Sequence, residues 1–223
     1  MDNFTWADGQ KQTAFPVARP GYPVIFAAAF TTAVFALLGL TIPAIMALAV
    51  TFFICFFFRD PDRVIPNAQR CVVSPADGKV IKAESCVNPR YYDGECIKVS
   101  IFMSVFNVHV NRISFSGIVD KILYHPGKFF SANLDKASLK NEHNAVFITT
   151  ETGEKICIVQ IAGLIARRIL CGLQAGDTVV KGRRFGMICF GSRLDVYLPG
   201  NMKIDVRVGE KVNAGQSVLG YLP

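Results

Sequence analysis

The heptapeptide GDTVVKG at residues 176–182 recurs as GEKVNAG at residues 209–215, giving the pattern G-[DE]-x-V-x-x-G at an offset of 33 residues. Glycine adopts backbone angles that other residues avoid, so glycines that bracket a short valine-containing segment are typical of tight turns beside strands. A pattern that recurs in this way predicts two quasi-symmetric halves built from β-structure. The dipeptide Gly191-Ser192 lies in the connection between the two copies.

Short segments rich in Val, Ile and Phe surround the repeat and predict strands. They are Val72-Val73 and residues 78–83, 97–103, 145–150 and 156–161. Turn sequences such as Ala76-Asp77-Gly78 separate several of them. The turns of the repeat resemble those of biotinyl/lipoyl-type β-sandwich domains. We therefore predict a mainly β fold, sandwich-like or barrel-like with biotinyl/lipoyl-type elements, over residues 67–223.

Residues 24–58 contain no charged side chain. As one helix they would extend about 52 Å, whereas the hydrocarbon core of a bilayer is about 30 Å thick. Gly39 and Pro43 lie near the middle, where a helix bends or ends. The pattern predicts an N-terminal apolar helical hairpin that anchors the chain to a membrane, within an N-terminal segment of residues 1–66.

Positive charges flank this apolar segment on both sides and concentrate in the rest of the chain. Lys11 and Arg19 precede the segment, and Arg59, Arg63 and Arg70 follow it. Basic flanks favour the cytoplasmic side, so we expect a cell-membrane protein with both ends of the hairpin and the β domain in the cytoplasm. The net charge of +7 favours contact with anionic lipid. No nucleic-acid-binding motif is present, and we expect no nucleic-acid partner.

The seven cysteines are odd in number and form no C-x-x-C pair, so neither a disulfide framework nor a zinc site is indicated. Gly191-Ser192 has more chemical interest. A serine hydroxyl can attack the preceding carbonyl and convert the amide to an ester, and glycine at that carbonyl leaves it unhindered. Gly-Ser is also an ordinary turn dipeptide.

A self-cleaving serine needs a base, and the sequence has three histidines: His109, His125 and His143. Period-two alternation predicts that His109 shares one face of a strand end with Asn107 and Asn111. Asp77 lies in a Pro-x-Asp-Gly turn sequence and is a candidate to orient or charge a histidine. Each of these residues also has an ordinary structural explanation.

Five motifs occur in an order that resembles the phosphatidylserine decarboxylases, in their short bacterial and archaeal form. They are FFRDP (57–61), SPADG (74–78), NVHVNR (107–112) within residues 102–112, NE (141–142) and FGSR (190–193). Each motif is weak alone, but their joint order covers nearly the whole chain.

The resemblance implies a membrane-attached proenzyme that cleaves itself between Gly191 and Ser192. The products would be a β chain of residues 1–191 and an α chain of residues 192–223, with a pyruvoyl group made from Ser192. That group would form a Schiff base with the amine of phosphatidylserine, a phospholipid substrate, and yield phosphatidylethanolamine. His109 is implied as the proton donor, and we take His109 with Asp77 as the base for cleavage.

This sequence departs from the long form of the family at two positions. The long form has threonine after the serine, whereas this chain has Arg193. The long form also has a second histidine three residues after the first, where this chain has Arg112. The Gly-Ser bond itself is present, so the cleavage site is carried over, whereas the base for cleavage cannot be the second histidine of the long form.

Three other hypotheses remain at this stage. The same chemistry could act on an archaeal-type serine ether phospholipid. From another class, the chain could be a membrane-tethered carrier module of biotinyl/lipoyl type, with Lys203 in the only adjacent Met-Lys pair as the carrier residue. A structural β domain would show no processing. Whether the protein forms a homo-oligomer is open.

Overall fold

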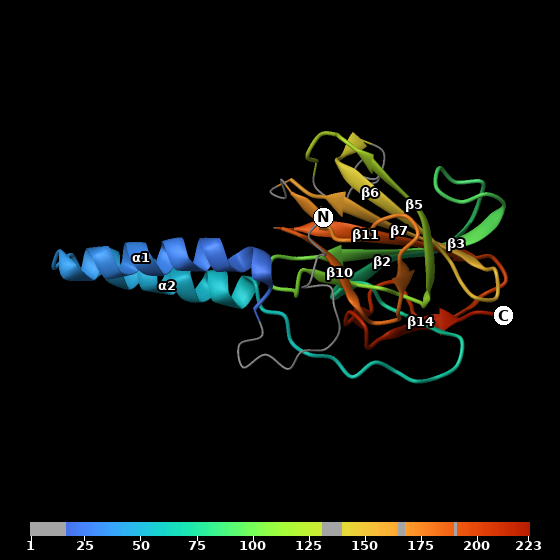
Figure 1. Cartoon of the computed structure of the whole chain (residues 1–223), viewed down its shortest axis with the longest axis horizontal. Coiled ribbons are helices and arrows are strands. Elements are labelled where there is room, and N and C mark those ends of the chain that lie inside the picture. The colour runs from blue at the N-terminus through green and yellow to red at the C-terminus, as the bar shows by residue number, and fades with distance from the viewer. Residues whose placement is uncertain (1–16, 131–139, 165–167, 190) are drawn as a thin grey trace. The chain divides into compact units, whose positions relative to one another are not determined.

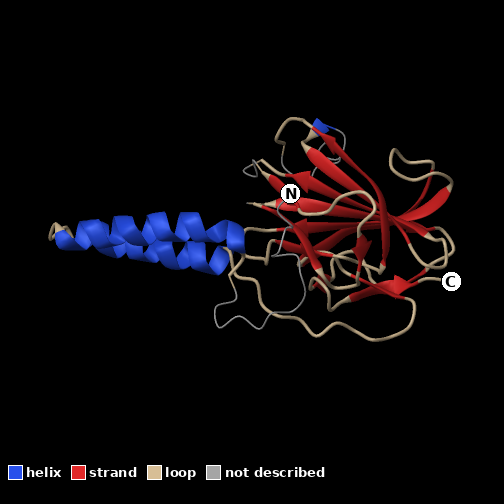
Figure 2. Ribbon diagram, in the orientation of Figure 1, coloured by secondary structure: helices blue, strands red, loops and turns tan. Residues whose placement is uncertain are grey.

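The computed structural model describes residues 17–130, 140–164, 168–189 and 191–223. The chain separates into two compact units, one that ends at Asp62 and one that begins at Arg63. The first is helical, and the second is built mainly of strands and loops (Figure 2). The mainly β fold with an N-terminal apolar helical hairpin is therefore confirmed.

The helical unit contains η1 (Arg19–Gly21), α1 (Tyr22–Leu37) and α2 (Thr41–Phe57). The turn between the two long helices contains Gly39, whose φ of 71° favours glycine. The helices pack side by side (Figure 1), and the hydroxyls of Thr32 and Thr51 lie 3.1 Å apart between them. Residues Arg19–Leu37 are long and apolar enough to cross a membrane, whereas α2 is shorter.

The β unit holds, within the described residues, one sheet of eight strands, called here the large sheet, and two sheets of three strands. The large sheet has the order β13 (Lys211–Val212), β2 (Gly78–Val87), β3 (Glu95–Met103), β11 (Ser192–Pro199), β7 (Lys155–Ala162), β6 (His143–Thr149), β5 (Gly117–His125) and β9 (Thr178–Val179). The small sheets have the orders β4 (Val110–Arg112), β10 (Arg184–Ile188), β8 (Ile169–Cys171) and β1 (Cys71–Val73), β14 (Val218–Tyr221), β12 (Lys203–Ile204). Neighbouring strands pair antiparallel.

The order of strands makes the large sheet quasi-symmetric about the boundary between β11 and β7, which lie side by side (Figure 1). We call β13, β2, β3 and β11 the first half, and β9, β5, β6 and β7 the second half. The repeat forms the two edges, since residues 209–215 supply β13 and residues 176–182 supply β9. The N–H of Gly209 donates to the carbonyl of Val80, and the N–H of Gly176 donates to that of Val119. The halves expected from the repeat are therefore present.

A second correspondence, at an offset of 39 residues, was not visible in the sequence. Gly78 begins β2 and Gly117 begins β5. A Cβ at Gly78 would lie 2.2 Å from the carbonyl oxygen of Phe102, and one at Gly117 would lie 2.3 Å from that of Thr149. Both strands also shift register just after their third residue. The same close approach therefore requires glycine in each half.

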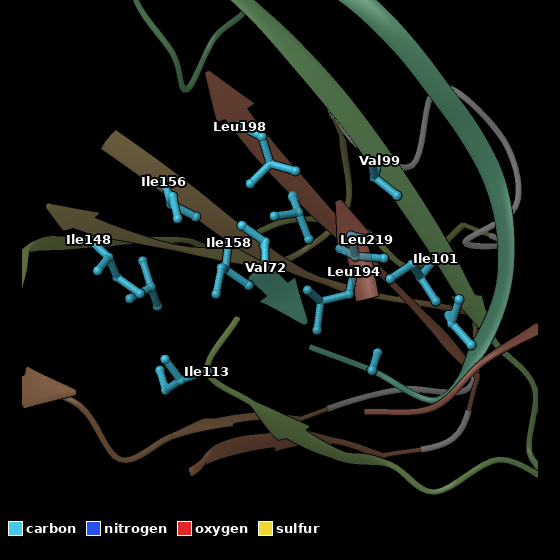
Figure 3. Close-up of a cluster of buried hydrophobic side chains, with 14 of the residues drawn as sticks. Val72, Val99, Ile101, Ile113, Ile148, Ile156, Ile158, Leu194, Leu198 and Leu219 are labelled. Atoms are coloured by element: carbon cyan, nitrogen blue, oxygen red, sulfur yellow. The ribbon is translucent and has the colours of Figure 1, made fainter. Parts of the chain in front are cut away.

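The main core packs against one face of the large sheet. Along β11 the side chains of Leu194, Val196 and Leu198 are fully buried in it, where Ile101 of β3 and Ile158 of β7 meet them (Figure 3). Successive side chains of a strand point to opposite faces, so Arg193 and Asp195 lie on the other face. That face carries a smaller cluster around Tyr197.

Candidate active site

Ser192 is the first residue of β11, at the centre of the large sheet. It pairs with Met103 of β3 on one side and with Ala162 of β7 on the other. The residue is fully buried, and its Oγ has no hydrogen-bond partner in the described part of the chain. A buried hydroxyl usually has such a partner, because leaving it without one costs free energy. This is the kind of exception found where a group is held for reaction.

Gly191 has a φ of 66°, a conformation that favours glycine. A Cβ at this position would meet nothing within 4 Å. Backbone conformation, rather than crowding, is therefore the reason that glycine suits this position. Because glycine has no side chain, no Cβ of its own hinders an attack on the Gly191 carbonyl carbon.

His109 is fully buried, and its Nδ1 lies 2.9 Å from the carbonyl oxygen of Asn107. Because a carbonyl only accepts, Nδ1 carries a proton and donates it, and neutral His109 keeps its lone pair at Nε2. The predicted strand face shared with Asn107 is wrong. The strand starts only at Val110, because the Asn107 side chain accepts hydrogen bonds from the backbone and hydroxyl of Ser104 and closes a turn.

A buried chain of amides links the NVHVNR motif to the neighbour of Ser192. Asn144 donates to Gln160 (3.1 Å), and Gln160 donates to the Oδ1 of Asn111 (2.9 Å). Asn111 in turn donates to the Sδ of Met103, the residue that pairs with Ser192. Sequence reasoning missed Gln160 because a lone glutamine in an apolar strand gives no local signal.

Asp77 lies just before β2 and is mostly buried. Its Oδ2 accepts an ion-paired hydrogen bond from Arg63 at 2.9 Å, and its Oδ1 accepts the backbone N–H of Ala214 at 2.7 Å. Ser116 occupies the corresponding place in the second half, where its Oγ accepts the backbone N–H of Lys181 at 3.0 Å. These contacts hold Asp77 at the turn of the repeat.

Arg112 occupies the position of the long form's second histidine, and it is buried at the end of β4. Its Nη1 donates to the carbonyl of Gly182 at 3.0 Å. Gly182 closes the first copy of the repeat, so this arginine fastens the motif segment to the repeat turn.

Arg193 is fully buried, which no local sequence pattern indicated. Its Nε and Nη2 bind the two carboxylate oxygens of Asp195 at 2.6 and 3.0 Å, and Nη2 also donates to the hydroxyl of Ser100. The Nζ of Lys98 lies 3.2 Å from the same carboxylate. Within the described residues, the Nη1 of Arg193 has no hydrogen-bond partner.

The other two histidines stack on each other, with ring centroids 4.8 Å apart. His143 is held by the Tyr91 hydroxyl at Nε2 and by the carbonyl oxygen of Asn141 at Nδ1. Burial lowers the pKa of the His143 imidazole below its usual value, which keeps the ring neutral. The ring therefore has a structural explanation in its contacts.

Lys203 belongs to β12 and pairs with Tyr221 of β14. A carrier module presents its lysine at the tip of a hairpin, whereas this lysine is the first residue of a short strand that is paired with β14. The carrier hypothesis therefore loses the one residue on which it depended.

The chain is similar to known proteins over most of its length. The family model described as phosphatidylserine decarboxylase matches residues 50–220. A phosphatidylserine decarboxylase proenzyme from Syntrophus aciditrophicus is 54% identical, with 92% of this chain and 96% of the relative covered. Proteins of the same name from Desulfotalea psychrophila and Geotalea uraniireducens are 49% and 48% identical, over 95% and 93% of this chain and 99% and 97% of the relatives.

Proposed function

Because this chain belongs to the phosphatidylserine decarboxylase family, and is a decarboxylase, we propose that it cleaves itself at Gly191-Ser192 and converts phosphatidylserine to phosphatidylethanolamine. The observation that carries the proposal is the buried hydroxyl of Ser192 with no hydrogen-bond partner among the described residues, directly after a glycine in a left-handed conformation. The hydroxyl is thereby available to attack, and the Gly191 carbonyl is unhindered.

The residues fit the pyruvoyl group that the family implies at position 192. Ser192 is fully buried between two strands, so a group formed there would be shielded from water. When present, the pyruvoyl carbonyls bind the substrate amine covalently and accept the electrons left behind when carbon dioxide departs.

His109 is the residue that we propose to move protons at this site. Its Nδ1 is committed to the Asn107 carbonyl, so its Nε2 is the atom that takes or gives a proton. The chain from Gln160 through Asn111 to Met103 positions the strand beside Ser192. Asp77 is proposed as a positioning residue, since its carboxylate fixes Arg63 and the turn at Ala214.

The cleaved pieces would stay together without a covalent link. An α chain of residues 192–223 would contain β11, which pairs along its length with β3 and for most of its length with β7. These two neighbours, both in the β chain, would retain it by the hydrogen bonds of a central strand.

The helical unit is proposed as the membrane anchor, on residues 1–66 with the catalytic domain of residues 67–223 on the cytoplasmic side. Large apolar side chains cover α1 and α2 and are mostly exposed, including Phe26, Leu37 and Ile42. Such a surface suits lipid chains rather than water. A phospholipid substrate explains why the anchor is needed, since the substrate resides in the bilayer.

Purified full-length protein provides the test. Denaturing electrophoresis with intact mass should give two fragments, the smaller one starting at a pyruvoyl-blocked position 192. Vesicles of phosphatidylserine labelled at the serine carboxyl should release labelled carbon dioxide. A single uncut chain that still decarboxylates would refute the proposed chemistry. Ether-linked and ester-linked substrates compared side by side would identify the preferred lipid.

A further inference from the structure

A buried amide lies across the strand that begins with Ser192. Gln160 of β7 and Met103 of β3 belong to the two strands that flank β11, and both are fully buried. Asn111 of β4 contacts both of these side chains. Its Oδ1 lies 2.9 Å from the Nε2 of Gln160, and its Nδ2 lies 3.8 Å from the Sδ of Met103. The carboxamide of Asn111 therefore bridges the two flanking strands across β11.

The register of the large sheet shows which residues of β11 lie between the two contacts of this bridge. Met103 pairs with Ser192, and Gln160 pairs with Leu194. Residues directly opposite each other in an antiparallel pair point to the same face, and Leu194 points into the main core. Ser192 lies two residues before Leu194 and so points to that same face. The Asn111 carboxamide and the Ser192 hydroxyl therefore share one buried face of the large sheet.

The hydrogen bonds of Gln160 determine which end of the Asn111 amide faces Met103. The Nε2 of Gln160 also donates to the carbonyl oxygen of Leu170 at 3.3 Å, and its Oε1 accepts from the Nδ2 of Asn144 at 3.1 Å. Nε2 is thus the donor to Asn111 as well. Asn111 consequently presents its Oδ1 to β7 and its Nδ2 to Met103.

The Nδ2 of Asn111 is a strong donor with a weak acceptor. An amide nitrogen carries two N–H bonds, whereas a thioether sulfur accepts only weakly, and Asn111 is fully buried away from bulk water. The Ser192 Oγ on the same face has no hydrogen-bond partner in the described part of the chain. A buried polar group without a good partner costs free energy. This environment therefore favours a reaction that creates an anionic oxygen for the donor.

Self-cleavage creates an anionic oxygen from the Ser192 hydroxyl itself. The Oγ attacks the Gly191 carbonyl carbon, the amide nitrogen leaves with the hydroxyl proton, and an ester results. A base then removes the Cα proton of Ser192, the Cβ–Oγ bond breaks, and Oγ departs with the electron pair as part of the Gly191 carboxylate. Dehydroalanine remains, and water converts it to the ketone with release of ammonia. Negative charge therefore develops on Oγ during the elimination.

We propose that Asn111 donates a hydrogen bond from Nδ2 to the Ser192 Oγ as the Cβ–Oγ bond breaks, and that Gln160 is the positioning residue that orients this donor. In the uncut chain Nδ2 contacts Met103, so the lone pairs of Oγ stay available for the attack. The hydrogen bond strengthens as charge develops on Oγ, which lowers the barrier to elimination rather than the barrier to ester formation. The inference rests on the self-cleavage proposed above.

Trapping the ester tests the step at which Asn111 acts. Processing of full-length wild type and Asn111→Leu, which removes the donor, is followed by denaturing electrophoresis and intact mass. Hydroxylamine, added as the chain is unfolded, cuts an ester but leaves an amide intact, and the new N-terminus is then a serine rather than a pyruvoyl group. Asn111→Leu should process about 10- to 100-fold more slowly, the loss expected for one hydrogen bond to a charged group. Hydroxylamine should cut its unprocessed chain at position 192.

A double-mutant cycle separates positioning from folding. Gln160→Leu keeps the Asn111 donor but removes the group that orients it, and should slow processing about 3- to 10-fold, the worth of one neutral hydrogen bond. Asn111→Leu/Gln160→Leu should be no slower than Asn111→Leu alone, because Gln160 acts through Asn111. The double variant also leaves neither member of this pair buried without the other, so it should fold even where a single variant does not.

Thr150→Val is a matched control for the loss of a buried hydrogen bond. It removes a hydroxyl that donates to Glu154 in the turn before β7, whereas Ala162, the partner of Ser192, lies at the other end of that strand. Thr150→Val should process at the wild-type rate. Once processed, Asn111→Leu should decarboxylate phosphatidylserine at the wild-type rate per pyruvoyl group, because the carboxylate that Asn111 stabilises has already departed.

Four results would overturn the inference. A wild-type processing rate in Asn111→Leu would exclude the donor, and an unprocessed chain resistant to hydroxylamine would place the block before the ester. Normal processing with slow decarboxylation would assign Asn111 to the substrate instead. Equal slowing in Thr150→Val would reduce the effect to lost stability. Additive losses in the double variant would remove Gln160 from its positioning role. An uncut wild type would refute self-cleavage itself, whereas each result above requires a wild type that is cut.

Discussion

The two halves of the large sheet share a frame but differ at one point. In the second half, β6 ends at Thr149 and β7 begins at Lys155, and these residues pair across a short turn. In the first half, Met103 at the end of β3 pairs in the same way with Ser192 at the start of β11. No short turn joins those two strands, because the chain reaches β11 from β10 instead.

The difference explains why one strand end suits cleavage and the other does not. The turn of the second half is closed by Glu154, whose carboxylate accepts hydrogen bonds from the hydroxyls of Thr150 and Thr152. The corresponding place in the first half holds Gly191 and the buried Ser192, whose Oγ has no partner within the described residues. A cut there breaks no hairpin and leaves β11 paired on both sides.

The largest effect is expected from removing the hydroxyl of Ser192, which is the reactive group that the first half of the large sheet has and the second half lacks. Ser192→Ala should abolish both processing and decarboxylation. Because the Oγ has no hydrogen-bond partner in the described chain, the free energy of unfolding should change by less than about 0.5 kcal/mol. Electrophoresis, mass and denaturant unfolding measure these quantities, and a large loss of stability would mean that the hydroxyl has a structural partner.

Gly78 and Gly117, which begin β2 and β5, occupy corresponding positions in the two halves. Substituting each of them tests whether the two halves share the same backbone arrangement. Gly78→Ala and Gly117→Ala each bring a Cβ to within 2.3 Å of a backbone carbonyl oxygen. Moving the backbone at either position costs free energy, so the free energy of unfolding of each variant should fall by about 3 kcal/mol. Denaturant unfolding measures this change.

Only one member of this pair should also affect cleavage. Gly78 contacts Phe102, the neighbour of the residue that pairs with Ser192. Gly78→Ala should therefore slow processing of the folded fraction, whereas Gly117→Ala should not. Equal processing in the two variants would show that strain in β2 does not reach the cleavage site.

The next largest effect is expected from exchanging Asp77 and Ser116, the two residues that bind the backbone of the repeat turns. Asp77→Ser would reproduce the arrangement of Ser116, keeping an oxygen for the N–H of Ala214 but losing the charge that pairs with Arg63. We expect processing to fall about tenfold, the effect of about 1.4 kcal/mol on a barrier. The matched variant Ser116→Asp should process normally, and a normal rate in Asp77→Ser would limit Asp77 to a role in folding.

Much of this comparison could be predicted from local sequence. Runs of Val, Ile and Phe predicted β3, β6 and β7 because strands that are largely buried on both faces select a nearly continuous apolar composition. The repeat predicted two quasi-symmetric halves because glycine and valine recur at fixed spacing, whereas the edge positions of its two copies emerge only from the sheet order. The membrane-like hairpin followed from the absence of charge between residues 24 and 58.

The remainder depended on contacts between distant segments. His109 lies outside a strand because the hydroxyl of Ser104 donates to the side chain of Asn107 and closes a turn. The alternation of polar and apolar residues did not predict this turn. The ion pair of Arg193 with Asp195 required knowing that Ser100 and Lys98 face the same side of the sheet. The symmetry of Gly78 and Gly117 is carried by single residues, too few to form a visible repeat.

The smallest expected effect lies in the turn that takes the place of the cleavage site. Hydrogen bonds from Thr150 and Thr152 lower the pKa of Glu154 to about 2. A group whose folded pKa lies below its unfolded value stabilises the protein above the unfolded pKa, and that contribution is lost as the pH falls. Glu154→Gln should cost about 1 kcal/mol at pH 7. The difference from wild type should shrink between about pH 4.5 and pH 2, as the wild-type carboxylate is protonated.

Denaturant unfolding at several pH values measures that difference, with processing at position 192 followed in the same samples. Processing should match wild type, because the Glu154 turn belongs to the second half and the cut belongs to the first. If Glu154→Gln slowed processing while the protein stayed folded, the two strand ends would be coupled through the paired strands β11 and β7. The turn at Glu154 would then influence cleavage of the Gly191-Ser192 bond, so the correspondence between the two halves would affect function as well as structure.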